Sequence, residues 1–235
     1  MTLVVLAVAL GAVAQAVSGV GFVLVCGPFL IASLGQAEGV RLALVLSLAV
    51  NTAVLLRSHR DVAWREALQL LVPAAVLTPV FALAVEAVPQ RLAQAVAGLS
   101  AVVGALALLA GVRWRAARGP GGAVGAGIVG AAMSVAAGMS GPPVVLWADN
   151  AGWAPERTRG TLQVYFLALN LVGIASLGLP HRGAGGLLAC LAAIALGLAV
   201  GTVVAHRVTG AAARRTTLAL AGAGGLVVLV RAIPF

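Results

Sequence analysis

Charged side chains are scarce in this sequence, and its carboxylates lie outside its apolar segments. Only 9% of the 235 residues are charged and 62% are hydrophobic, whereas soluble domains carry about 25% charged residues. The composition therefore indicates an integral membrane protein. Its six carboxylates all lie at segment ends or in loops, as Glu38, Asp61, Glu66, Glu86, Asp149 and Glu156. A carboxylate proton relay inside the membrane is accordingly not expected.

The sequence also lacks the motifs of several other functions. It contains no phosphate-binding loop of the form GxxxxGK followed by Ser or Thr, which excludes ATP hydrolysis by that route. Its two cysteines, Cys26 and Cys190, lie within apolar runs and do not suggest a disulfide framework. Its histidines are peripheral to the apolar segments, so neither a buried metal site nor a serine–histidine hydrolase is predicted. We expect neither an enzyme nor a cofactor.

The basic residues are all arginines, fifteen in number, and they lie between or beside apolar runs. The net charge of +9 would suggest a nucleic-acid partner in a soluble protein. In a membrane protein, flanking arginines mark the cytoplasmic side. We therefore interpret them as a topology signal, and we expect a lipid bilayer rather than nucleic acid as the partner.

Eight apolar segments follow one another along the chain, at about 2–34, 40–56, 67–86, 92–112, 123–148, 160–179, 184–205 and 216–233. Most are close to the ~20 residues that span a bilayer as a helix. The first and fifth, with 33 and 26 residues, would reach roughly 50 and 39 Å as straight helices. The hydrocarbon core is only about 30 Å thick. Each of these two segments therefore tilts strongly, or breaks and folds back as a hairpin of two half-helices.

Glycine and proline mark a break in both long segments. The first contains Ser18–Gly21 (SGVG), and the fifth contains Gly138–Pro143 (GMSGPP). Glycine releases the backbone, and proline suits the first turn of a new helix. Two interrupted apolar segments at corresponding places in two halves of a chain point to the binding site of a transporter.

The two halves of the chain resemble each other at a constant shift of 119 residues. This shift places Gly19 on Gly138 and Asn51 on Asn170. The paired asparagines distinguish the repeat from chance matches between apolar stretches. We expect one all-α membrane domain of two inverted repeats, each with a broken or hairpin first helix followed by three transmembrane helices. The repeats would occupy residues 1–118 and 119–235.

The arginines test the two hairpins. If all eight segments crossed the membrane, eight arginines would lie on one side and seven on the other. If the first and fifth segments turn back, eleven lie on one side and four remain on the other, Arg41, Arg91, Arg182 and Arg231. Eleven against four is a clear positive-inside pattern. The tryptophans also lie near the arginine-rich side, as Trp64, Trp114, Trp147 and Trp153.

The same count results if only the fifth segment turns back. The first segment is therefore either a hairpin or a single tilted helix with a break. With two hairpins, each half crosses the membrane three times. An odd number of crossings gives the two halves opposite orientations, which is the inverted-repeat architecture of many carriers.

A helix break exposes backbone N–H groups at the start of the second half-helix, together with the positive end of its dipole. Such groups bind an anion without any formal charge. The sequence predicts these donors at residues 20–22 and at residues 140 and 141, and Ser18 and Ser140 add hydroxyl groups. We expect an anion site formed by Ser18, Gly19, Val20, Gly21, Phe22, Gly138, Met139, Ser140, Gly141 and Pro142.

Asn51 and Asn170 lie far inside the second and sixth segments. A buried amide costs roughly 2–7 kcal/mol unless it is paired. Each asparagine therefore contacts the cargo, bonds to the unwound backbone of a hairpin tip, or connects neighbouring helices. Gln15, Gln163 and Tyr165 are weaker candidates of the same kind.

At the two break motifs the sequence resembles the sulfite exporter TauE/SafE family, also called the 4-toluene sulfonate uptake permease family. The first motif of that family is approximately G-x-G-G-G with a later proline, and it corresponds here to Gly19–Phe22 with Pro28. The second is similar to Gly138–Pro143. Phe22 stands where a glycine is common, which predicts a narrower tip or a different cargo. The resemblance covers nearly the whole chain.

The resemblance implies secondary transport of a small sulfur-containing anion, such as sulfite or a sulfonate, across the bacterial cytoplasmic membrane. We expect an inverted-repeat carrier that works by alternating access around the two breaks, with the asparagines supporting the anion site. Two alternatives stay open. The chain is an anion channel, or it is a membrane subunit of a larger complex.

Overall fold

The computed structural model describes residues 2–19, 21–112, 118–181, 184–205, 207 and 210–232, and this part of the chain is all-helical. Each predicted apolar segment is a helix or a pair of helices. In chain order they are α1 (Thr2–Ser18), α2 (Phe22–Leu34), α3 (Gln36–Ser58), η1 (His59–Asp61), α4 (Trp64–Glu86), α5 (Gln90–Ala110), α6 (Pro120–Ala137), α7 (Gly141–Asn150), α8 (Pro155–Leu177), α9 (Ala184–Ala205) and α10 (Gly210–Ala232).

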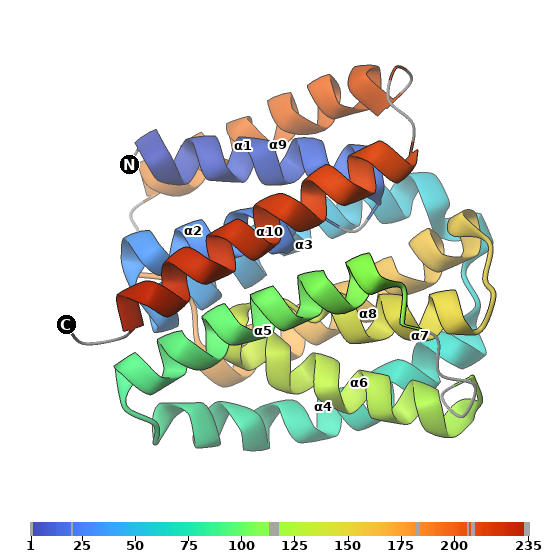
Figure 1. Cartoon of the computed structure of the whole chain (residues 1–235), viewed down its shortest axis with the longest axis horizontal. Coiled ribbons are helices and arrows are strands. Elements are labelled where there is room, and N and C mark those ends of the chain that lie inside the picture. Colours follow the sequence, from blue (N-terminus) through green and yellow to red (C-terminus); the bar gives the residue numbers. More distant parts are fainter. Residues whose placement is uncertain are drawn as a thin grey trace.

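Both long segments are broken at the predicted glycines. The breaks separate α1 from α2 and α6 from α7. In each break a glycine has a positive φ, 82° at Gly19 and 72° at Gly138, which side chains with a Cβ rarely adopt. The two helices on either side of each break lie against each other and run in opposite directions (Figure 1). The first segment is thus a hairpin, like the fifth.

Within the described residues, seven helices are long and apolar enough to cross a membrane: α3 with η1, α4, α5, α6, α8, α9 and α10. Six of them are the crossing helices that the sequence predicts, three in each half. The seventh is α6, the long arm of the second hairpin. Large apolar side chains are exposed on the outside of the bundle, for example Val76, Leu83 and Leu188. Exposed apolar surface of this kind suits contact with lipid, and the chain is a multi-pass membrane protein.

The helices pack in pairs. α1 lies against α9 along one edge of the molecule and α4 against α6 along the opposite edge, with α5–α10 and α3–α8 between them (Figure 1). Under the shift of 119 residues, α1 corresponds to α6 and α9 to α4, so the α1–α9 pair is equivalent to the α6–α4 pair. In the other two pairs, α5–α10 and α3–α8, each helix is packed against its own equivalent. Two inverted repeats would produce such a pattern. The inverted repeat and its boundaries stay a prediction.

One end of the bundle is rich in arginine. The start of α1 and the end of α10 lie at the opposite end (Figure 1). There, Arg41 Nε donates to Leu177 O at 2.7 Å and Arg231 Nη1 to Ala32 O at 2.8 Å, so both arginines stabilise helix C-termini. We call the other end the arginine-rich end, and its described arginines include Arg57, Arg60, Arg65, Arg157 and Arg159. Arg113, Trp114, Arg115 and Arg182 lie outside the described residues.

Candidate functional site

The two hairpin tips and two crossing helices line a partly open cavity of about 40 Å³. This volume accommodates ~3 water molecules. We call it the central cavity. The residues that line it are all neutral, and they are Gln15, Gly21, Phe22, Val23, Leu24, Ser47, Asn51, Gly138, Met139, Ser140, Gly141, Phe166 and Asn170.

Eight of the twelve predicted site residues line the central cavity: Gly21, Phe22, Asn51, Gly138, Met139, Ser140, Gly141 and Asn170. The structure places three others elsewhere. Ser18 and Gly19 line a second cavity on the arginine-rich side of the first tip. Pro142 packs against α5, with its ring 2.7 Å from the point where a Cβ on Gly104 would stand. Val20 lies outside the described residues.

Asn51 and Asn170 face the central cavity from α3 and α8. Their exposed fractions are only 5% and 4%, yet neither amide forms a hydrogen bond with another described residue. Buried polar groups are nearly always hydrogen-bonded, so both side chains need a partner within the cavity. Among the described residues they do not connect neighbouring helices.

The first tip is capped by its own hairpin. The side chain of Gln15 in α1 accepts hydrogen bonds at Oε1 from the N–H groups of Gly21, at 2.7 Å, and Phe22, at 3.0 Å. Its Nε2 donates to Gly19 O at 3.0 Å. The prediction that the Gly21 and Phe22 N–H groups are free for an anion is therefore wrong. Gln15 precedes Gly21 by six residues and Phe22 by seven. Its side chain reaches both N–H groups because the chain turns back at Gly19.

The second tip has no such cap. The side chain of Ser140 does not cap the start of α7, and among the described residues nothing accepts a hydrogen bond from the N–H of Ser140 or Gly141. The two prolines that follow have no N–H to donate. The position equivalent to Gln15 holds Ser134, whose shorter side chain lacks the reach of a glutamine. The donors predicted at residues 140 and 141 are thus unoccupied.

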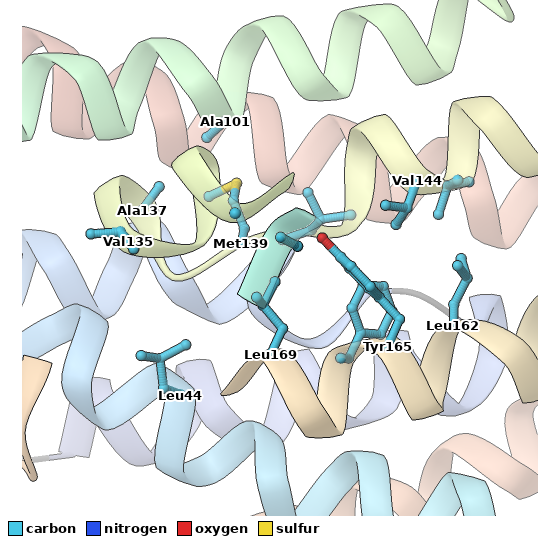
Figure 2. Close-up of a cluster of buried hydrophobic side chains, with 14 of the residues drawn as sticks. Leu44, Ala101, Val135, Ala137, Met139, Val144, Leu162, Tyr165 and Leu169 are labelled. Carbon is cyan, nitrogen blue, oxygen red and sulfur yellow. The ribbon is translucent and has the colours of Figure 1, made fainter. Parts of the chain in front are cut away.

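The second tip is embedded in apolar side chains. Figure 2 shows the cluster that contains Met139 of the break and Ala137 of α6, together with Tyr165 and Leu169 of α8 and Leu44 of α3. The hydroxyl of Tyr165 donates to Gly127 O of α6 at 3.3 Å. Apolar surroundings lower the local dielectric constant, which strengthens any hydrogen bond made inside the cavity.

Ser47 and Phe166 line the central cavity although the sequence did not single them out. They are themselves related by the shift of 119 residues. Each precedes one of the paired asparagines by four positions, which places it on the same helix face. Examining the positions one helical turn before the paired asparagines would have identified both residues from the sequence. Ser47 Oγ donates to Ala43 O at 2.6 Å, so its oxygen retains accepting capacity.

Gln163 of α8 lies beside the first tip and is fully buried. Its Nε2 lies 3.5 Å from Gly19 O, a long distance for a hydrogen bond. Its Oε1 has no hydrogen-bond partner among the described residues. The contact between α8 and the first tip is therefore weak compared with the bonds that Gln15 makes within the hairpin.

These features define a class of protein: a helical membrane protein with a buried polar site between two hairpin tips. The model of the sulfite exporter TauE/SafE family matches residues 3–228, nearly the whole chain. The chain belongs to this family, and the resemblance seen at its break motifs is confirmed. The family is one of transporters, and membership implies membrane transport of sulfur-containing anions. No curated protein and no solved structure matches the chain.

Proposed function

We propose that the chain is a secondary transporter that carries a small sulfur-containing anion, such as sulfite or a sulfonate, across the cytoplasmic membrane. The anion binds in the central cavity. The observation that carries this proposal is the pair of buried asparagines, Asn51 and Asn170, which face the cavity from equivalent positions without a hydrogen-bond partner among the described residues. An oxyanion supplies the acceptors that both amides lack.

The donors around the cavity suit an anion. They are the amide groups of Asn51 and Asn170, the hydroxyl of Ser140 and the N–H groups at the start of α7. A hydrogen bond to a charged group contributes roughly 1.5–3 kcal/mol, and dehydrating an ion costs several kcal/mol. Five such bonds, one from each of these groups, are sufficient to offset that cost. The positive dipole ends of α2 and α7 add to the attraction.

The arrangement of the two tips favours alternating access over a channel. The cavity lies between the hairpins, and residues of both tips that line it are buried, with Phe22 3% and Ser140 6% exposed. A channel requires a continuous path, whereas a carrier requires a site that is closed from each side in turn. In our proposal each hairpin tip closes the site toward one side of the membrane.

The test is flux of labelled sulfite in proteoliposomes that contain the purified chain. We expect saturable uptake with counterflow. Asn51→Leu and Asn170→Leu should each raise the half-saturating concentration about ten- to hundredfold, because each removes one charge-assisted hydrogen bond. Their melting temperature in detergent should stay the same or rise, since an unpaired buried amide is removed.

Thr78→Val is the matched control. Thr78 is fully buried in α4 and donates only to Ala74 O in its own helix, at 2.7 Å, so its replacement should leave sulfite flux unchanged. Ionic conductance without saturation would identify a channel. Absence of flux for both sulfite and a sulfonate would overturn the proposed cargo. A fall in the melting temperature of both asparagine variants without a change in affinity would assign the amides to helix packing.

A further inference from the structure

The first tip has a second face, on the arginine-rich side. Here Ser18 and Gly19 line a cavity of about 190 Å³ together with residues of α7, α8 and α10. We call this cavity the inner vestibule. The first tip contributes to the walls of both cavities, since Gly21 and Phe22 line the central cavity and Ser18 and Gly19 line the vestibule.

Arg159 places a cation in the wall of the inner vestibule. It lies four residues after the start of α8, and its Nε is 3.1 Å from the point where a Cβ on Gly19 would stand. Its guanidinium makes no ion pair or hydrogen bond with any other described residue. Arg157, two residues earlier, pairs with Glu66 at 2.8 Å. Arg159 is exposed, and Arg57, Arg60 and Arg65 likewise form no ion pair with a described residue. What distinguishes Arg159 is its position in the lining of the vestibule, beside the first tip.

Other polar groups line the vestibule around Arg159. Thr158 and Thr217 contribute hydroxyl groups from α8 and α10. The hydroxyl of Ser18 donates to Ala14 O at 2.7 Å, so it is engaged in its own helix. Asp149 also lines the cavity, and it has interactions of its own. The vestibule therefore combines the Arg159 guanidinium, which has no ion pair among the described residues, with hydroxyl groups and with a carboxylate that is engaged in an interaction of its own.

The equivalent position at the second tip does not hold a cation. The residue equivalent to Arg159 under the shift of 119 is Val40, whose Cα lies 3.7 Å from the point where a Cβ on Gly138 would stand. The same position of the fold therefore holds an arginine at one tip and a valine at the other. This arginine–valine difference does not change the charge of the central cavity, which is lined by neutral residues.

We propose that the inner vestibule is a second binding site for a small oxyanion, in which the Arg159 guanidinium holds the anion on the arginine-rich side of the first tip. A guanidinium binds two oxygens of a tetrahedral or pyramidal oxyanion through parallel N–H groups. The positive-inside rule places this end of the bundle in the cytoplasm. In transport, this site would bind the anion before the first tip moves. This role rests on the proposed function.

The test separates the vestibule from the central cavity. The double variant Asn51→Leu, Asn170→Leu disables the central site, and isothermal titration calorimetry with sodium sulfite then measures binding to the detergent-solubilised full chain. We expect one binding site per chain in this background. Adding Arg159→Gln should weaken binding at least tenfold, and Arg159→Lys should weaken it less. Adding Arg60→Gln, which removes the same charge from an exposed position at the same end, should leave it unchanged.

Two results would overturn the vestibule site. One is the absence of sulfite binding in the double variant, and the other is equal binding with and without Arg159→Gln. The proposed function is tested separately by flux in the wild-type chain, so a chain that binds sulfite at Arg159 yet transports none refutes the function and keeps the site. In flux measurements of known orientation, Arg159→Gln should raise the half-saturating concentration for sulfite at the arginine-rich end and not at the opposite end.

Discussion

The first and second hairpin tips have the same backbone turn. In each, a glycine with positive φ donates its N–H to the carbonyl oxygen four residues earlier, Gly19 to Gln15 and Gly138 to Ser134, both at 2.8 Å. In each, the next helix begins three residues after that glycine. The two turns are related by the shift of 119 residues, so their backbone geometry depends on the glycines and not on the surrounding side chains.

Three of the differences between equivalent side chains at the two tips bear on their chemistry. Gln15 caps the first tip where Ser134 leaves the second uncapped, Phe22 occupies the cavity wall where the second tip has Gly141, and Arg159 faces the first tip where Val40 faces the second. The first tip therefore satisfies its own donors, and the second presents its donors to the central cavity. One backbone design thus serves two different chemical tasks.

The largest effect is expected from filling the open tip. Gly141→Leu places four carbon atoms at the wall of a cavity that holds ~3 water molecules, in effect giving the second tip the bulk that Phe22 gives the first. We expect sulfite flux to fall below detection, with membrane insertion and melting temperature retained. Wild-type flux in a correctly inserted Gly141→Leu chain would remove the second tip from the site.

A smaller effect is expected from removing the cap of the first tip. Gln15→Leu leaves the N–H groups of Gly21 and Phe22 without an acceptor, and each unsatisfied group costs about 1–3 kcal/mol. The two groups together cost roughly 2–6 kcal/mol, so the melting temperature in detergent should fall by about 4 °C or more, at 2–4 °C per kcal/mol in a chain of this size. Ser134→Ala at the equivalent position of the second tip is the control and should change it by less than about 2 °C. Similar shifts in both variants would contradict the difference between the tips.

The smallest effect is expected from reducing the size of the side chain at position 22 in the first tip. Phe22→Leu removes part of the ring from the cavity wall, at a stability cost below about 1.5 kcal/mol. We expect the rate for an aryl sulfonate relative to sulfite to rise roughly tenfold, the discrimination that a few apolar atoms in a pocket provide. Competition between the two labelled anions in proteoliposomes measures this ratio. An unchanged ratio would mean that Phe22 does not limit cargo size.

The helices and breaks were predictable because bilayer thickness and chain chemistry determine them directly. The segment predicted at 184–205 is α9 (Ala184–Ala205), and the segment at 67–86 is α4 (Trp64–Glu86) with three more residues at its start. The positions of both breaks follow from glycine and proline, and the paired asparagines follow from the repeat. Each of these features depends on local sequence or on a fixed shift along the chain.

The contacts at the first tip were not predictable in the same way. Gln15 is a single polar residue in an apolar run, and only the turn at Gly19 brings its side chain to the N–H groups of Gly21 and Phe22. Arg159 is 140 residues away from Gly19 in the sequence, and its place beside that glycine depends on how α8 packs against the first hairpin. The arginine count predicted the side of the membrane on which Arg159 lies, but it did not predict that Arg159 lies beside Gly19.

The cap that Gln15 forms has a consequence for motion. All three residues that it bonds belong to the same hairpin as Gln15 itself, while the contact from the tip to Gln163 of α8 is long, at 3.5 Å. The bonds that Gln15 makes therefore do not depend on where the hairpin lies relative to α8. If the first tip moves as our proposal requires, the amide protons of Gly21 and Phe22 should exchange slowly with deuterium both with and without sulfite.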